Sequence, residues 1–369
     1  MSKHKKYSHR KNILLLLLVL SSHIWADDPP EISVLSLDVP IWANGLNHAE
    51  WLLAGNKDNA KKIGFFNLSA KKSNMPTKPI TQKEDDIGRT SRSLPLYLAE
   101  RINVETGCNA TNYIFVIKGA GPVLSVEEWS FEILKSIAIK NELDIVVFGH
   151  YEKDYLDLRS TLKIEAWDVK QEKKVFSIVE KTFFSETSGV AAKIPFYFQS
   201  ELEEKGICQY TNSNKYPKPD PNILPQYLDG LGQLLAQTLA DNEILPGSAI
   251  WGEAQMIEWY RSLWQDMPES DANRLMFAKG LIASKRYGGT VHKEYSVNFR
   301  NFLDLNFDTS DTLSKLSPLF YSEFGFESEC ISAKKKLSEV KGRYNEWLLR
   351  INCSSSNKSI QPIAKEAVD

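Results

Sequence analysis

Histidine is scarce in this chain, and the cysteine and histidine spacings that usually hold zinc are missing. Three of the six histidines stand in the first 26 residues, at His4, His9 and His23. The remaining three stand in unrelated contexts, at His48, His150 and His292. The sequence has neither a Cys-x-x-Cys nor a His-Glu-x-x-His pattern, the usual signatures of zinc sites. We therefore expect no metal site of standard spacing.

Catalytic and nucleotide-binding motifs are missing as well. The segment 119–121 (Gly-Ala-Gly) suggests a phosphate-binding turn, but Leu124 stands where the motif needs its third glycine, and there is no P-loop. The Ser-x-x-Lys patterns at 69–72 and 332–335 lack the Lys-Thr-Gly and Ser-Asp-Asn partners of penicillin-binding proteins. No Gly-x-Ser-x-Gly is present. We predict a protein without enzymatic activity and without a cofactor.

An excess of basic charge is also absent. The chain has 45 lysines and arginines against 47 aspartates and glutamates. Residues 1–26 contain five of the basic residues and none of the acidic ones, so the rest of the chain carries 40 against 47, a net charge of −7. Because these charges are spread along the sequence, there is no basic stripe of the kind that binds nucleic acid. We expect no nucleic-acid partner.

The amino terminus has the pattern of a secretory signal peptide. A basic head, Met1–Asn12, precedes the unbroken apolar run Ile13–Leu20, and a small residue, Ala26, ends the segment before two acids. The run is much shorter than the roughly 20 residues that span a bilayer. We predict cleavage after about Ala26 and a periplasmic or secreted protein without a stable transmembrane anchor. The alternative interpretation is an uncleaved membrane anchor.

Four cysteines lie beyond this segment, at Cys108, Cys208, Cys330 and Cys353. An even number in an exported chain favours disulfides, and three pairings are open. We prefer Cys108–Cys208 with Cys330–Cys353, because each bond then lies within one predicted domain. The alternative is four free, buried thiols.

The segment 27–210 has the pattern of a mixed α/β domain. Apolar alternation and short apolar runs predict strands at Ile32–Val39, Ile63–Leu68, Tyr113–Ile117, Asp144–His150, Leu156–Trp167 and Lys174–Phe183. Helical periodicity predicts helices at Leu46–Ala54, Leu94–Val104, Ser125–Glu142 and Val190–Lys205, the third with a Ser125–Glu128 capping box. The polar stretch 69–93 is predicted to be a long loop.

The second half of the sequence is helical in pattern. A proline-rich linker is predicted at 211–222 and a disordered tail at 354–369. Between them, in 223–353, the expected helices are 224–240, 249–266, 271–285, 291–304, 311–323 and 327–351. Helix 249–266 is apolar on several sides, so we expect it to be sandwiched between neighbours. The predicted fold class is therefore α+β, a small mixed sheet domain followed by an all-α domain of helical hairpins.

The order of elements in the first domain resembles a known family. It is similar to the small α/β domain at the amino terminus of TolB, in the curli-secretion lipoprotein CsgG, and in periplasmic proteins that join it to helical repeats. The motifs that carry the resemblance are Phe65–Ser69, Val146–Gly149 and the turn Trp167–Glu172, which here lacks the family's glycine. The resemblance covers about 60–208 and implies a non-catalytic domain for envelope assembly and protein contacts.

Few residues qualify as a binding site from sequence alone. His150 ends a predicted central strand, where clefts of α/β sheets form. The aromatic residues Trp251, Trp259, Trp264 and Tyr260 could line a sugar- or peptide-binding groove, although core packing is the plainer interpretation. We predict a non-enzymatic interaction protein of the envelope that binds a protein partner through the 69–93 loop, the groove between the domains, or the helical domain.

Two other functions stay open. A cell-envelope glycan hydrolase needs two carboxylates flanking the scissile bond, and no pair stands out among the acidic residues of this chain. A periplasmic solute-binding protein is the third alternative, although the helical half does not fit a two-lobed α/β design.

Overall fold

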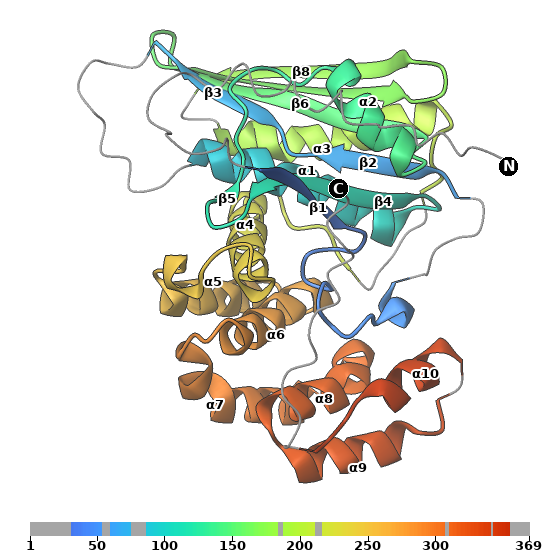
Figure 1. Ribbon diagram of the computed structural model, residues 1–369, viewed down its shortest axis with the longest axis vertical. Coiled ribbons are helices and arrows are strands. Elements are labelled where there is room, and N and C mark those ends of the chain that lie inside the picture. The colour runs from blue at the N-terminus through green and yellow to red at the C-terminus, as the bar shows by residue number, and fades with distance from the viewer. Residues whose placement is uncertain are drawn as a thin grey trace, which may run out of the picture.

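A computed structural model describes residues 31–53, 60–74, 86–183, 187–210, 216–306, 310–340 and 342–354. The first half of the chain forms an eight-stranded mixed sheet, and the second half forms an array of helices beneath it (Figure 1). The α+β fold class expected from the sequence is confirmed. The predicted signal peptide lies outside the described residues, as does the predicted tail beyond Ser354. Among the described residues, no helix is both long and apolar enough to cross a membrane.

The strands of the sheet are ordered β1-β4-β2-β6-β7-β8, with β3 beside β6 and β5 beside β4. Their bounds are β1 Ile32–Leu37, β2 Lys62–Phe66, β3 Ser69–Ser73, β4 Asn109–Ile117, β5 Gly121–Pro122, β6 Ile145–Asp154, β7 Arg159–Asp168 and β8 Lys173–Phe183. Strands β4, β2 and β6 are parallel, as is β3 to β6, while β1, β5, β7 and β8 pair antiparallel to their neighbours. The predicted hairpin is the β7–β8 pair.

Helices cover the two faces of the sheet unequally. Helices α1 (Asp86–Glu105) and α3 (Thr187–Glu204) cover one face, where Ile63, Ile145 and Val147 are buried. Helix α2 (Phe131–Lys140) covers the start of β6 on the other face. Because side chains alternate along a strand, the first half of β6 is apolar on both sides, as expected of a central strand.

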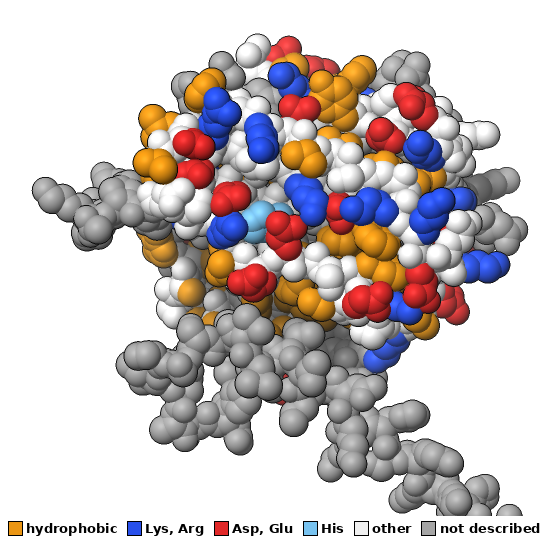
Figure 2. Space-filling view, turned by 90° about the horizontal axis from the view of Figure 1, so that it is seen from above, with side chains coloured by type: hydrophobic (Ala, Val, Ile, Leu, Met, Phe, Trp, Pro, Cys, Tyr) orange, Lys and Arg blue, Asp and Glu red, His pale blue; other side chains and the backbone are white. Residues whose placement is uncertain are grey.

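The second half of β6 leaves the cover of α2 and becomes polar on that open face. Glu152 pairs with Lys71 of β3 at 3.5 Å, and Glu165 of β7 pairs with both Lys163 and Lys174. Seen from above, basic and acidic side chains are intermingled here, around a histidine (Figure 2). The face therefore shows no patch of a single sign.

The helical array begins with α4 (Leu224–Asp241), which packs against α1 and joins the two halves. The array continues through η3 (Gly247–Ala249), α5 (Glu253–Asp266), α6 (Asp271–Arg286), α7 (Val291–Asn306), α8 (Asp311–Phe324), α9 (Glu327–Leu337) and α10 (Arg343–Arg350). Each helix buries an apolar stripe against its neighbours, in one continuous core. From α4 to α9, consecutive helices pack together, as Figure 1 shows, while α10 packs against η1.

The segment after β1 leaves the sheet and enters this helical core. Trp42 and Leu46 are fully buried there, and Trp347 of α10 donates a hydrogen bond to the Leu46 carbonyl at 3.1 Å. The short 3-10 helix η1 (Glu50–Leu52) follows, so only part of the predicted helix at Leu46–Ala54 forms. Nothing in the local sequence pattern indicates this packing, because its partners are distant in sequence, from 58 positions for Glu100 to 301 for Trp347.

The prediction of one long loop at 69–93 is wrong at both ends. Ser69–Ser73 forms β3, because its backbone pairs with the second half of β6 and Ala70 is buried against α1. Helix α1 starts at Asp86, eight residues before the predicted start, and its serines Ser91 and Ser93 are buried. The residues between, 75–85, lie outside the described part of the chain. Neither element could be predicted from hydrophobic periodicity, because small and partly buried polar residues give little periodic pattern.

The predicted capping box at Ser125 and Glu128 does not form. The Ser125 hydroxyl donates to the Glu127 carbonyl, and α2 begins only after Ser130. Trp129 holds the intervening stretch against the sheet, stacking on Phe115 at 4.9 Å and donating to the Asn67 carbonyl at 2.7 Å. The tertiary contacts of this indole outweigh a local cap of about 1 kcal/mol.

Two predictions in the helical half are also corrected. The helix expected at 327–351 is two helices, because α9 already ends at Leu337 and α10 starts only after Gly342, whose φ of 89° is unfavourable for other residues. The predicted linker is in part packed, since Tyr216 is buried and stacks on Trp42 at 5.1 Å. The remaining predicted helices form close to their expected positions.

Candidate binding cleft

Helix α1 faces three surroundings, each with different side chains. Leu94, Leu98 and Ile102 recur every fourth residue and face the sheet. Tyr97, Arg101 and Glu105 form the next stripe, which lines a cleft between α1 and α3. Glu100 faces the helical array.

The same reasoning applies to α3, which forms the opposite wall. Ile194, Phe198 and Leu202 are buried against the sheet at a spacing of four. Phe196 and Tyr197 stand off this stripe, and Phe196 is 70% exposed beside the cleft. An aromatic ring left in solvent at the rim of an apolar cleft is typical of a binding surface.

The cleft has a volume of about 240 Å³ and lies where the sheet half meets the helical half. Its third wall is the chain between the two halves, with Lys218, Pro219 and Pro221. The full lining is Tyr97, Leu98, Arg101, Glu105, Pro195, Phe196, Phe198, Gln199, Tyr210, Lys218, Pro219, Pro221 and Leu224.

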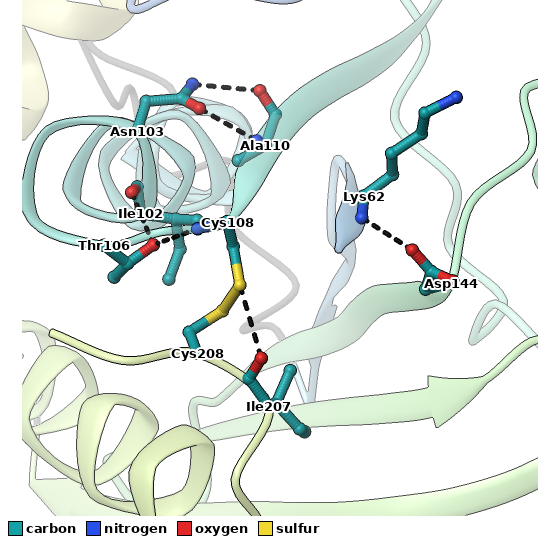
Figure 3. Close-up of a disulfide and its surroundings, with 9 residues drawn as sticks. All are labelled: Lys62, Ile102, Asn103, Thr106, Cys108, Ala110, Asp144, Ile207 and Cys208. Atoms are coloured by element: carbon teal, nitrogen blue, oxygen red, sulfur yellow. Dashed lines mark hydrogen bonds between the residues drawn. A yellow bond between two sulfur atoms is a disulfide. The ribbon is translucent and has the colours of Figure 1, made fainter. Parts of the chain in front are cut away.

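A disulfide holds the two helical walls together at one end. Cys108 and Cys208 are bonded just beyond the ends of α1 and α3 (Figure 3). Thr106 pairs with Tyr210 alongside. Figure 3 also shows the Thr106 hydroxyl between the Ile102 carbonyl and the Cys108 amide, and Asn103 bound twice to Ala110. The disulfide therefore ties the ends of α1 and α3 together beside the cleft.

Charged groups cross the floor of the cleft and pair with each other. Arg101 forms an ion pair with Glu105, and Lys218 contacts Glu105 at 3.5 Å while donating to Gln199 at 2.7 Å. Arg101 also donates to the Tyr216 carbonyl at 2.9 Å. Burial raises the pKa of the Tyr97 and Tyr210 phenols, so both rings stay neutral.

Next to the cleft, Glu100 links three parts of the chain. Its carboxylate accepts hydrogen bonds from Trp42 at 2.9 Å and from Tyr227 of α4 at 2.8 Å. Burial raises the pKa of Glu100 to about 7, although Arg101 and the two hydrogen bonds act in the opposite direction. Helix α1 is thereby joined to the helical array through one buried carboxyl group.

His150 lies elsewhere, in the middle of β6 and not at a strand end. It is 6% exposed, and its Nδ1 is 2.9 Å from the Ser69 hydroxyl, which also donates to the Gly149 carbonyl. Its Nε2 has no hydrogen-bond partner in the described structure. Burial lowers the pKa of His150, which favours the neutral ring. Among the described residues, no three His, Cys, Asp or Glu side chains gather into a cation site.

The three tryptophans of the predicted aromatic groove face different surroundings. Trp251 precedes α5 and is 81% exposed. Trp259 donates to the Gln226 carbonyl of α4, and Trp264 packs in the core against Phe302 at 4.5 Å. Helix α5 does lie between neighbours, since it packs against α4 and α6, but it fully buries a narrow stripe of three side chains, Ile257, Tyr260 and Leu263.

Sequence reasoning named a groove between the domains but none of the residues that line it. Phe196 and Tyr197 follow Pro195 in a run that also fits a buried helix, and Arg101 resembles any other surface charge of α1. The sequence feature that could have indicated this wall is the i, i+4 spacing of Tyr97, Arg101 and Glu105, next to the apolar stripe of the same helix.

The architecture is thus a mixed α/β sheet joined to a helical array, with a small apolar cleft at the junction. No protein-family model matches the chain, and no curated protein sequence matches it. Among solved structures, the LpoB C-terminal domain from Salmonella enterica is similar over 38% of this chain and 98% of that one, with 9% identity and a TM-score of 0.22. A similarity at this TM-score carries no argument about function, and the resemblance to the TolB and CsgG domains is not confirmed.

Proposed function

We propose that this chain is an exported, non-enzymatic protein of the cell envelope that binds a protein partner in the cleft between α1, α3 and residues 216–224. The observation that carries the proposal is the exposed ring of Phe196 at the rim of an aromatic-lined cleft, whose two helices are linked at one end by a disulfide. Aromatic side chains beside a preformed cleft supply contact area at low entropic cost, as in interaction sites.

Two further features support the proposal. The disulfides Cys108–Cys208 and Cys330–Cys353 suit an oxidising compartment, in line with the predicted signal peptide. The charged groups of the cleft, Arg101, Glu105 and Lys218, are engaged with one another. Groups paired in this way stabilise the walls and are poorly placed to transfer protons to a substrate.

Site-specific photo-crosslinking in intact cells tests the proposal. A photo-reactive amino acid replaces Phe196 in one strain and Phe183 in another. Phe183 is a suitable control, because it is exposed and the strand alternation places it on the face of the sheet opposite α3. We expect a discrete protein adduct from position 196 and none from position 183.

Two results would overturn the proposal. One is the absence of any adduct at position 196, or equal adducts at both positions. The other is release of soluble fragments when the purified protein is incubated with cell-wall glycan, which would favour a hydrolase instead.

A further inference from the structure

A stretch of the chain's own amino-terminal half lies on the helical array in the way that a bound peptide would. We call residues 45–53 the docked segment; it follows the turn after β1 and contains η1 (Figure 1). Four side chains each donate a hydrogen bond to one of its main-chain carbonyls, at distances of 3.1 to 3.3 Å: Arg286 to Gly45, Trp347 to Leu46, Arg350 to His48 and Tyr216 to Leu52. Because these donors contact the main chain, they hold a peptide whatever most of its side chains are.

One position of the docked segment has room only for glycine. A Cβ atom at Gly45 would lie 2.7 Å from Nζ of Lys279 on α6. Lys279 is fully buried and paired with Asp241 of α4 at 3.1 Å, so its ammonium group does not give way. The φ of Gly45, 76°, also favours glycine. The site therefore requires glycine at this point.

Two side chains of the docked segment fill apolar places. Leu46, the next residue, is fully buried in the core of the array. Further along, the Trp51 ring packs edge-on against Tyr344 and Trp347 of α10, with centroid distances of 5.0 and 5.4 Å. Together with Gly45 they define the ligand: glycine, an apolar residue directly after it, and an aromatic ring at the spacing of Trp51 from Leu46.

The docked segment fits this site imperfectly. Asn47 and His48 have φ values of 52° and 51°, a left-handed backbone that residues other than glycine adopt at a cost in free energy. Asn47 Nδ2 and Trp51 Nε1 are buried without a hydrogen-bond partner in the described structure. A segment without these costs would bind the same donors more tightly than the chain's own segment does.

The residues that precede the docked segment are held separately. Trp42 is fully buried, stacks on the Tyr216 ring at 5.1 Å and donates to Glu100 at 2.9 Å. Neither contact involves α6 or α10. Residues 45–53 can therefore leave these two helices while Trp42 stays bound.

We propose that the helical array has a second binding site, which residues 45–53 fill in the free protein and which a segment of a partner protein with the same pattern occupies in their place. This inference goes beyond the proposed function, because the site lies on α6 and α10 and not between α1 and α3. The chain's own segment competes at an effective concentration of about 1 mM, as tethered ligands do, so it lowers the affinity for the partner without abolishing it.

Hydrogen exchange in the wild-type chain, followed by nuclear magnetic resonance, tests whether the docked segment leaves the array. Two buried indole N–H groups are compared: Trp347, which donates to the docked segment, and Trp42, which donates to Glu100. We expect the Trp347 proton to exchange at least about tenfold faster, because local opening releases it without unfolding the rest. Equal exchange rates would mean that the docked segment opens only with the whole protein, and would overturn the inference.

A labelled synthetic peptide with the sequence of residues 43–53 tests the site directly by fluorescence anisotropy. We expect it to bind a full-length chain carrying Leu46→Asp at least about tenfold more tightly than the wild type, since that variant releases the docked segment. The control chain carries Leu162→Ala, which removes a buried side chain of the sheet instead. Within the peptide, Gly45→Ala and Leu46→Asp should each weaken binding at least about tenfold.

The outcomes separate this inference from the proposed function. No binding of the peptide to the folded Leu46→Asp chain, an equal gain with Leu162→Ala, or equal affinity for the two altered peptides overturns the inference. Circular dichroism checks that both chains are folded, and if Leu46→Asp does not fold, the indole exchange of the wild type decides. The crosslinking at position 196 concerns another surface, so each of these results leaves the proposed function standing.

Discussion

The indole nitrogen of Trp42 donates a hydrogen bond to the carboxylate of Glu100 at 2.9 Å, across 58 positions of sequence. Trp42 belongs to the segment that leaves the sheet, and Glu100 belongs to the helix that covers it. The Tyr227 hydroxyl of α4 completes the arrangement. One buried carboxyl group thus connects the sheet, the crossing segment and the helical array, and its protonation affects all three.

Stability should depend on pH through Glu100. Its pKa rises from 4.5 to about 7 on folding, so the folded state binds more protons between these values, and the free energy of unfolding falls as pH rises through this window. Through this group, the wild-type protein should lose about 2–3 kcal/mol of its free energy of unfolding between about pH 5 and pH 8, and Glu100→Gln should not show this loss. Urea unfolding of both proteins at both pH values measures the difference. The exposed Glu346→Gln is the control, and an identical pH dependence in wild type and Glu100→Gln would refute the assignment.

The two disulfides should differ in their contribution. Cys108–Cys208 spans 100 positions and Cys330–Cys353 spans 23. Loop-closure entropy gives about 5 kcal/mol for the longer loop and about 3 kcal/mol for the shorter. Replacing Cys108 and Cys208 with alanines should therefore lower the free energy of unfolding more than replacing Cys330 and Cys353. Unfolding measurements without reductant check this. Thiol labelling of protein taken directly from cells should find all four cysteines oxidised, and reduced cysteines would contradict export.

Gly149 in β6 should not tolerate a side chain. A Cβ atom there would overlap the carbonyl oxygen of Lys163 on β7. Separating the two strands costs roughly 1–3 kcal/mol, as overpacking does in cores. Gly149→Ala should lower the free energy of unfolding by this amount in urea titrations. Gly107→Ala is the matched control, since a Cβ at Gly107 meets nothing within 4 Å; an equal loss in both variants would disprove the explanation.

Replacing two tryptophans of the helical half with alanine should have very different effects on stability. Trp347 is fully buried, binds the Leu46 carbonyl and contacts Trp51, so Trp347→Ala should cost about 3–5 kcal/mol. Trp251 is 81% exposed, and Trp251→Ala should stay within about 0.5 kcal/mol of wild type. Thermal unfolding of both variants checks this. A large loss with Trp251→Ala would mean that this residue packs against a part of the chain outside the described residues.

Much of the fold follows from local patterns. The double-sided apolar run of β6, the alternation in β7 and β8, and the stripe Leu94, Leu98 and Ile102 each predict their element, because each buries one or two regular faces. The preferred pairing of the cysteines follows from the predicted domain division alone, because each bond then lies within one domain. Strand β3 was missed, since its pairing with β6 is a long-range interaction that leaves no periodic trace in five polar and small residues.

The sequence by itself determined the class of this protein: a mixed sheet followed by helices, four cysteines in pairs, and no familiar catalytic motif. Only the tertiary structure decided which side chains meet. It buried Trp42 and Tyr216 against each other, left Trp251 in solvent, and placed Arg101 and Phe196 on two walls of one cleft. Periodicity records which face of an element is buried, whereas the identity of the partner depends on contacts between residues far apart in the chain.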